Sequence, residues 1–143
     1  MAGYSGTPLA KKLGIKEKFR VALGNAPQGF RKELGELPDG VTFVKESKKP
    51  VDLILLFVKS RSELSKNFAK LASKLAPAGM LWVAWPKKAS GVPTDLSFEA
   101  VQEIGLTAGL VDTKICAIDE VWSGLRFVIR VKDRPGASTQ KGR

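Results

Sequence analysis

Two uninterrupted apolar runs, residues 53–58 and 80–85, constrain the fold of this chain more than any other feature of its sequence. Because neither run alternates with polar residues, we expect two strands, over residues 51–58 and 80–85, that are buried on both faces as in a parallel sheet. Between them, a helix is predicted to begin at Ser62 and to end at a turn over residues 77–79. The apolar stripe of this helix consists of Leu64, Phe68, Leu71 and Leu75. This order of elements favours a right-handed crossover between parallel strands.

Further helices and strands extend this unit in both directions. Helices are predicted over residues 9–14 and 30–37, and from an N-cap at Ser97 to Gly109. Strands are predicted over residues 19–23, 41–44, 110–118 and 125–131. The last two strands are too close in sequence for a crossover, so we expect an antiparallel hairpin at one edge. The predicted fold is α/β: a small Rossmann-like three-layer sandwich with a mostly parallel sheet of about six strands.

The length of 143 residues fits one domain. We expect it to span residues 1–132, followed by a disordered C-terminal tail over residues 133–143. The first residues show no basic region leading into an apolar stretch, and no apolar run approaches the ~20 residues of a membrane helix. We therefore expect a cytoplasmic protein that does not insert into a membrane.

The composition excludes several kinds of chemistry. The chain has no histidine, which excludes a Ser-His-Asp or Cys-His mechanism and histidine ligands for zinc or haem. Its single cysteine, Cys116, excludes an intramolecular disulfide, a cysteine-ligated zinc site and an iron–sulfur cluster. No metal is expected, no cofactor is identified, and the sequence leaves open whether the protein is an enzyme.

A ligand is expected at the carboxyl ends of the predicted strands, where open α/β sheets bind their ligands. The side chains that the topology would gather there form a mixed polar and aromatic set. The candidate ligand-binding residues are Asn25, Trp85, Lys87, Lys88, Ser90, Trp122 and Ser123. The two tryptophans would supply apolar walls of a crevice, and the polar residues would orient the ligand. The alternative is that these are ordinary polar loops anchored by tryptophans.

The loop over residues 85–95 is the most specific part of this set. Lys87 and Lys88 are paired cations, Ser90 and Gly91 offer hydroxyl and backbone donors, and a helix begins shortly afterwards. This combination suits a phosphate or a carboxylate, although no phosphate-loop fingerprint is present. We therefore expect an anionic small molecule as the ligand.

Two neighbouring carboxylates are the candidates for catalysis. Asp119 and Glu120 follow the predicted strand over residues 110–118, and they would form an acid–base pair if burial raised the pKa of one of them. The alternative, a solvated hairpin turn, is the more common role of such a pair.

The basic charge of the chain suggests a second kind of partner. Lys and Arg number 24 against 14 Asp and Glu, a net charge of +10. Lys66, Lys70 and Lys74 form a row at helical spacing, which would allow weak, non-specific contact with nucleic acid. No sequence-specific recognition motif accompanies the row, and a solvated helix face would look the same.

The segment LGIKEKFRVALGNA, residues 13–26, resembles the entry to a class I methyltransferase, in which a glycine-rich loop follows the first strand. The resemblance implies S-adenosylmethionine as a cofactor and places Glu46 where a ribose-binding carboxylate would lie. The alternative, a solvated glutamate, is the more common role of a lone carboxylate. Three features depart from the methyltransferase pattern. Pro27 occupies a position that favours glycine, and the acidic residue usual at the end of the first strand is absent. A short loop also replaces a helix–strand unit before residue 51.

A second resemblance rests on WVAWPKK at residues 82–88, AGL at 108–110 and WSGLRFV at 122–128. With these motifs the chain resembles the bacterial family of domain of unknown function 3052, over nearly its whole folded length. This resemblance implies a compact α/β protein but no activity. The leading hypothesis is a binding or regulatory module for an anionic small molecule. The alternatives are a reduced methyltransferase-like enzyme and a nucleic-acid-associated accessory protein.

Overall fold

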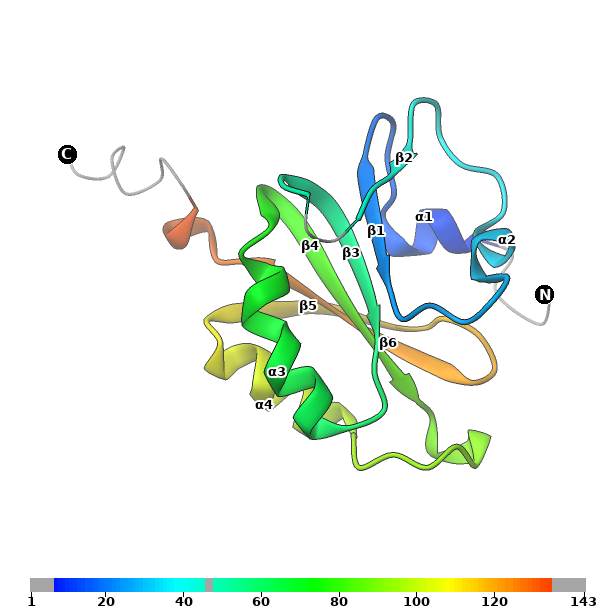
Figure 1. The fold of residues 1–143 in the computed structure, drawn as a ribbon, viewed down its shortest axis with the longest axis vertical. Coiled ribbons are helices and arrows are strands. Elements are labelled where there is room, and N and C mark those ends of the chain that lie inside the picture. The colour runs from blue at the N-terminus through cyan, green and yellow to red at the C-terminus, as the bar shows by residue number, and fades with distance from the viewer. Residues whose placement is uncertain (1–6, 46–47, 135–143) are drawn as a thin grey trace.

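The computed structural model describes residues 7–45 and 48–134, and its six strands form one sheet in the order β2-β1-β3-β4-β6-β5. The strands are β1 (Arg20–Gly24), β2 (Thr42–Phe43), β3 (Val51–Phe57), β4 (Leu75–Pro86), β5 (Leu110–Ala117) and β6 (Trp122–Ile129). The first four are parallel, and β6 lies antiparallel between β4 and β5. The predicted Rossmann-like architecture, with its C-terminal antiparallel hairpin, is therefore confirmed (Figure 1).

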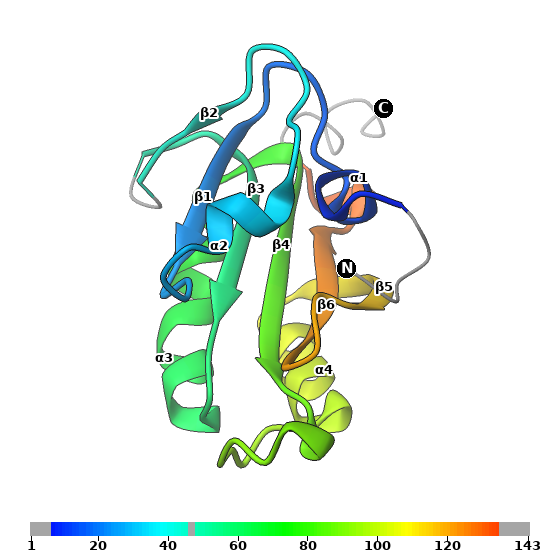
Figure 2. The same ribbon diagram turned by 90° about the vertical axis from the view of Figure 1, so that its right-hand side faces the viewer.

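Helices cover both faces of the sheet, which gives three layers (Figures 1 and 2). The helices are α1 (Leu9–Leu13), α2 (Phe30–Leu34), α3 (Arg61–Ala72) and α4 (Phe98–Thr107), with single 3-10 turns at η1 (Lys88–Ser90) and η2 (Val131–Asp133). The pair α3 and α4 covers one face, and α1 and α2 cover the other. None of the helices in the described part of the chain has the length and apolar character needed to cross a bilayer.

The alternating side chains of the central strands build a separate core on each face. Ile54, Leu56 and Val83 pack with Leu64 and Phe68 of α3. The neighbouring residues in the strands point the other way and form the second core with α1 and α2, made of Leu53, Leu55, Phe57, Trp82, Ala84, Leu13, Phe30 and Leu34. Both faces of β3 and β4 are thus buried, as their uninterrupted apolar runs predict.

Trp82 fixes α1 against the sheet. Its side chain is fully buried, and its Nε1–H donates a 2.8 Å hydrogen bond to the carbonyl of Leu13 at the end of α1. A buried indole without an acceptor would leave a polar group unsatisfied, so this bond allows the large ring to fill the core.

The boundaries of α3 differ from those that the sequence predicts. The N-cap is Ser60 rather than Ser62, because the hydroxyl of Ser60 accepts the N–H of Glu63 at 3.1 Å. The helix ends at Ala72, and Leu75 belongs to β4 instead of the helical stripe. The capping bond decides the first boundary, and pairing of Leu75 with Val51 decides the second.

The ends of the last strand also differ. β6 begins at Trp122, earlier than the predicted strand over residues 125–131, because it pairs with β4 as far as Pro86. The predicted tail begins within η2, and its residues 135–143 lie outside the described residues.

Candidate functional site

The order in which the strands are added to the sheet changes side between β1 and β3. These strands are neighbours and parallel, with Gly24 beside Leu56 near their carboxyl ends. After β1 the chain forms α2 on one face and continues to β2, whereas after β3 it forms α3 on the other face and continues to β4. The connections therefore diverge at these two carboxyl ends, which makes this the topological switch point where open α/β sheets bind ligands.

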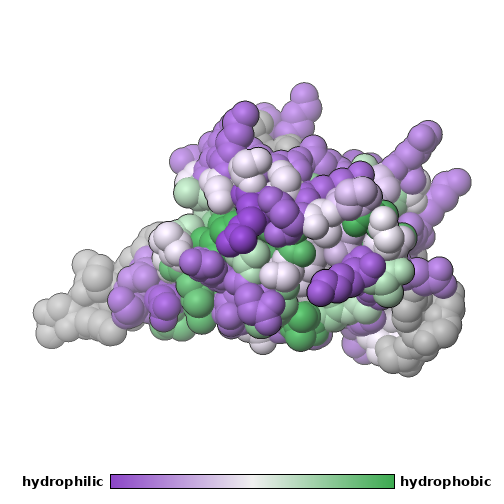
Figure 3. Space-filling model, turned by 90° about the horizontal axis from the view of Figure 1, so that it is seen from below, coloured by the Kyte–Doolittle hydropathy of each residue, from purple (hydrophilic) through white to green (hydrophobic). Residues whose placement is uncertain are grey.

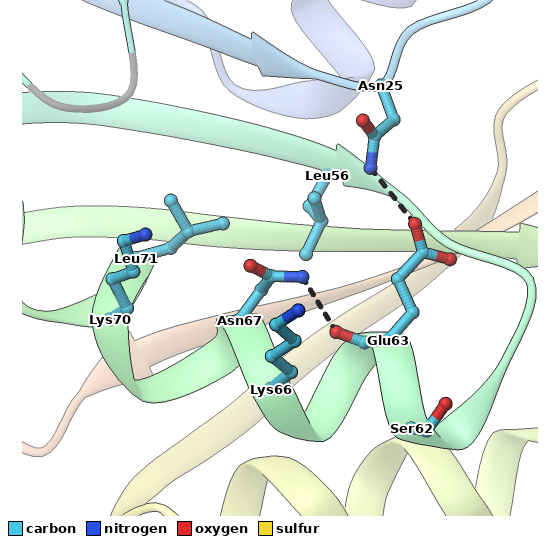
Figure 4. Close-up of a pocket in the computed structure, with 8 residues that line it drawn as sticks. All are labelled: Asn25, Leu56, Ser62, Glu63, Lys66, Asn67, Lys70 and Leu71. Atoms are coloured by element: carbon cyan, nitrogen blue, oxygen red, sulfur yellow. Dashed lines mark hydrogen bonds between the residues drawn. The ribbon is translucent and has the colours of Figure 1, made fainter.

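A pocket of about 500 Å³ lies at this switch point, between the end of β1 and one side of α3 (Figure 4). Asn25 borders it from the β1–α2 loop, Leu56 from β3, and the remaining residues from α3. The lining residues are Asn25, Leu56, Ser62, Glu63, Lys66, Asn67, Lys70 and Leu71. The volume is within the range of small-molecule sites, roughly 300–1,000 Å³.

Asn25 and Glu63 form a fixed polar pair at one end of the pocket. Asn25 adopts a left-handed conformation with φ of 57°, which asparagine tolerates better than most residues. Its amide Nδ2 donates to Glu63 Oε2 at 3.2 Å and to the carbonyl of Phe57 at 3.3 Å. The other carboxylate oxygen of Glu63 accepts the N–H of Lys59 at 3.2 Å. These bonds fix the carboxylate of Glu63 beside the carboxyl ends of β1 and β3.

The other end of the pocket is basic. Lys66 and Lys70 are exposed, lie one turn apart on α3, and form no ion pair with any described residue. Leu56 and Leu71 are buried beneath them and give the pocket an apolar floor. Asn67 donates from Nδ2 to the carbonyl of Glu63 at 2.8 Å, which orients its amide (Figure 4). The pocket therefore combines two unpaired cations, fixed polar groups and an apolar floor.

Residues of the loop after β4 bind the N-terminus of α3. The N–H of Arg61 donates to Asp95 Oδ1 at 2.7 Å, and the hydroxyl of Thr94 donates to the carbonyl of Lys59 at 2.6 Å. The loop after β4 thus docks against α3 and supplies a carboxylate to the positive end of the helix. A ligand anion would have to displace Asp95 to bind there.

The two predicted tryptophan walls do not face a common crevice. Trp85 is 5% exposed and belongs to the core under α3 and α4, whereas Trp122 is 9% exposed and belongs to the core on the opposite face. Trp122 stacks edge-to-face with Phe57, with ring centroids 4.9 Å apart. Their adjacent places at the end of the sheet put the two indoles on opposite sides of it.

The other predicted loop residues are separated from the pocket as well. The N–H of Lys87 donates to the carbonyl of Val121 at 2.8 Å, and the hydroxyl of Ser90 donates to the carbonyl of Lys87 at 2.7 Å. Lys88 is exposed, and Ser123 pairs with Trp85 within the sheet. Of the seven predicted ligand-binding residues, Asn25 alone is among the residues that line this pocket. A role in binding for the others stays a prediction.

The edge of the sheet at the carboxyl ends shows a mixed surface. Hydrophilic residues cover most of it, and hydrophobic residues show between them (Figure 3). Within the described residues no group of three side chains has the composition and arrangement of a metal site. Glu46, which the methyltransferase resemblance places at a ribose, lies outside the described residues.

The structure pairs Asp119 with Glu33 of α2, rather than with Glu120. Asp119 Oδ1 accepts the N–H groups of Val121 and Trp122, both at 2.9 Å, so the carboxylate closes the β5–β6 turn. Partial burial raises the pKa of Glu33 to about 7, and a hydrogen bond to Asp119 and its negative charge add to the shift. Glu120 is exposed. Asp119 was a sequence candidate, but its partner is remote in the sequence.

The fold resembles those of several methyltransferases. An S-adenosylmethionine-dependent methyltransferase from Aquifex aeolicus is 20% identical, with a TM-score of 0.58, and the match covers 83% of this chain and 86% of that chain. Fibrillarin from Aeropyrum pernix, solved with bound S-adenosyl-L-methionine, is 12% identical with a TM-score of 0.56, covering 88% and 70%. Both belong to the class of Rossmann-like proteins that this sheet and its helices define.

A comparison of the sequence with protein families identifies the family of this chain. The family described as "Protein of unknown function (DUF3052)" matches residues 24–131, and the chain belongs to it. No curated protein matches the chain. The resemblance stated from the motifs around Trp82, Ala108 and Trp122 is therefore confirmed, and so is the weaker likeness to a methyltransferase fold.

Proposed function

We propose that this protein is a binding module for an anionic small molecule, which it holds in the pocket between β1 and α3. A single observation carries the proposal: Lys66 and Lys70 border a pocket at the topological switch point and have no anionic partner among the described residues. The two lysines are four residues apart, about 6 Å along the helix axis, so both side chains can reach one phosphate or carboxylate group.

The surroundings of Lys66 and Lys70 favour a role in anion binding over that of a solvated helix face. A wall of protein on one side lowers the local dielectric, so an anion between the two lysines is attracted more strongly than in bulk water. The apolar floor of Leu56 and Leu71 accepts the uncharged part of a small molecule. Asn25 and Ser62 supply the groups that orient it.

The test compares three double variants that each remove two positive charges. Lys66→Ala/Lys70→Ala removes the proposed anion site, Lys87→Ala/Lys88→Ala removes the site that the sequence favours, and Lys11→Ala/Lys32→Ala changes exposed lysines on α1 and α2. Thermal unfolding is measured at low salt against a panel of phosphorylated and carboxylated metabolites. The melting temperature should rise for at least one metabolite in the wild type, and this rise should disappear only in Lys66→Ala/Lys70→Ala. Loss of the rise only in Lys87→Ala/Lys88→Ala would refute the proposal.

A reduced methyltransferase-like enzyme is the second candidate. It is supported by the likeness to folds whose solved structures are described as methyltransferases, some with bound S-adenosylmethionine. Isothermal titration with S-adenosylmethionine tests it. S-adenosylmethionine carries a carboxylate as well as a cationic sulfonium, so the titration is repeated with Lys66→Ala/Lys70→Ala to show whether that carboxylate uses the two lysines. Millimolar S-adenosylmethionine that gives no heat of binding would remove this candidate.

The proposal also includes a cellular location and a weak contact with nucleic acid. A single cysteine is compatible with the reducing cytoplasm, where phosphorylated metabolites are abundant, and we propose this location for the protein.

Weak contact with nucleic acid would use Lys66 and Lys70 as well. Affinity for a single-stranded oligonucleotide should then fall steeply with salt and fall again in Lys66→Ala/Lys70→Ala. A salt-independent affinity would contradict phosphate contacts.

A further inference from the structure

We infer that the ligand of this pocket is a phosphorylated polyhydroxy compound, whose hydroxyl groups bind at Glu63 and whose phosphate binds at Lys66 and Lys70. The inference rests on the proposed function, because it takes the same pocket and names the chemical class that fits it. It follows from the order of acceptors and cations along one side of α3 (Figure 4).

The end of the pocket near β1 is rich in hydrogen-bond acceptors. Each carboxylate oxygen of Glu63 accepts one hydrogen bond from the protein and keeps capacity for another. Asn25 uses its Nδ2 group as a donor, and its Oδ1 atom has no donor among the described residues. Asn67, one turn farther along α3, adds another such Oδ1 between the two lysines. Such a set binds a ligand that carries donors, and neighbouring hydroxyl groups match it.

The backbone positions of the two lysines follow that of Glu63 at a defined spacing along α3. At a rise of about 1.5 Å per residue, Lys66 is about 4.5 Å and Lys70 about 10 Å farther along the axis of α3 than Glu63. A ligand that contacts both Glu63 and the lysines would therefore carry its hydroxyl groups about 5–10 Å from its anionic group. A five-carbon sugar with a terminal phosphate has these dimensions.

The acidic end also excludes other anions. A dicarboxylate that spans the pocket would place one of its carboxylates beside Glu63, where like charges repel. A phosphorylated polyol presents neutral donors at that position, so it meets no such repulsion. Leu56 and Leu71 give the sugar or an attached base an apolar surface to rest on.

Calorimetric titrations with inorganic phosphate, ribose, ribose 5-phosphate, adenosine 5′-monophosphate and glutamate test the inference. Ribose 5-phosphate should bind at least about tenfold more tightly than inorganic phosphate, because hydrogen bonds to a charged acceptor contribute roughly that factor. Tighter binding of the nucleotide than of the sugar phosphate would identify a nucleoside monophosphate. Equal binding would identify the sugar phosphate, and both results support the class.

Variants separate the two ends of the pocket. Glu63→Gln should remove the advantage of ribose 5-phosphate over phosphate and leave phosphate affinity unchanged or higher, whereas Lys66→Ala/Lys70→Ala should weaken both. Because Glu63 also accepts the N–H of Lys59, Asn67→Ala provides a second variant that should weaken ribose 5-phosphate selectively. Glu99→Gln, an exposed acid in the first turn of α4, is the matched control.

The outcomes distinguish this inference from the proposed function. If phosphate and ribose 5-phosphate bind equally, or if Glu63→Gln leaves their ratio unchanged, the inference is overturned and the anion site stands. If glutamate binds best, the acidic end recognises an ammonium group and the inference is again overturned. If none of the anions binds, both proposals fail.

Discussion

Gly105 in the middle of α4 gives the sharpest test of how the core is packed. A Cβ atom at this position would overlap the Cε1 and Cζ atoms of the Phe127 ring. Phe127 is fully buried in β6, and its ring stacks edge-to-face with Phe68 of α3 at 5.1 Å between centroids. The glycine is therefore needed for space, so that α4 can lie close to the sheet.

Two effects of opposite sign decide the stability of Gly105→Ala. Alanine favours a helix interior by about 1 kcal/mol relative to glycine. Overpacking a tight core costs about 1–3 kcal/mol, and the upper end applies here because Phe68 blocks the escape of the Phe127 ring. We expect a net loss of about 2 kcal/mol in the free energy of unfolding.

Urea denaturation measures this loss, with Thr107→Ala as the control in the same helix. Thr107 is exposed, so the control should change the free energy of unfolding by less than about 0.5 kcal/mol. In a double-mutant cycle, Phe127→Leu should make Gly105→Ala much less costly, because the smaller side chain removes the overlap. A Gly105→Ala protein as stable as the wild type would refute the packing of α4 on β6.

Three further predictions concern single residues. Because the pKa of Glu33 is raised to about 7, the protonated carboxyl stabilises the fold fully below its ordinary pKa near 4.5, and this contribution is lost as the pH rises through 7. Urea titrations at pH 5 and pH 8 should show a smaller loss of stability in Glu33→Gln than in the wild type, and identical losses would contradict the raised pKa of Glu33. Ser60→Ala should cost about 1 kcal/mol through the lost N-cap while Ser62→Ala costs less than about 0.5 kcal/mol, and the reverse order by thermal unfolding would exclude this cap. Burial raises the pKa of the Cys116 thiol, so a thiol reagent at pH 8 should react more slowly with the folded than with the urea-unfolded protein, and equal rates would show an open thiol.

The order of the elements and the fold class were accessible from the sequence because they depend on local patterns. The apolar runs at residues 53–58 and 80–85 lie in and directly after β3 and in β4, and the short connection before Trp122 marks the hairpin. Boundaries were less accessible. Ser60 and Ser62 are chemically equal cap candidates, and only the bond to the N–H of Glu63 selects Ser60.

The candidate site was only partly predictable, since it depends on which face of the sheet each residue occupies. The carboxyl edge and Asn25 followed from topology. The basic row that contains Lys66 and Lys70 was visible as helical spacing, but the sequence does not show that β1 leaves a pocket beside it. The contact between Glu33 and Asp119 joins segments far apart in the chain, and no local pattern reports it.

The central claim is that an anion binds beside α3 at the switch point and not at the loop after β4. Amide chemical shifts of the ¹⁵N-labelled protein, followed during a titration with ribose 5-phosphate, test this claim most directly. The account predicts saturable shifts at Asn25, Lys66 and Lys70. Shifts confined to Lys87 and Lys88, with the α3 amides unchanged, would contradict it.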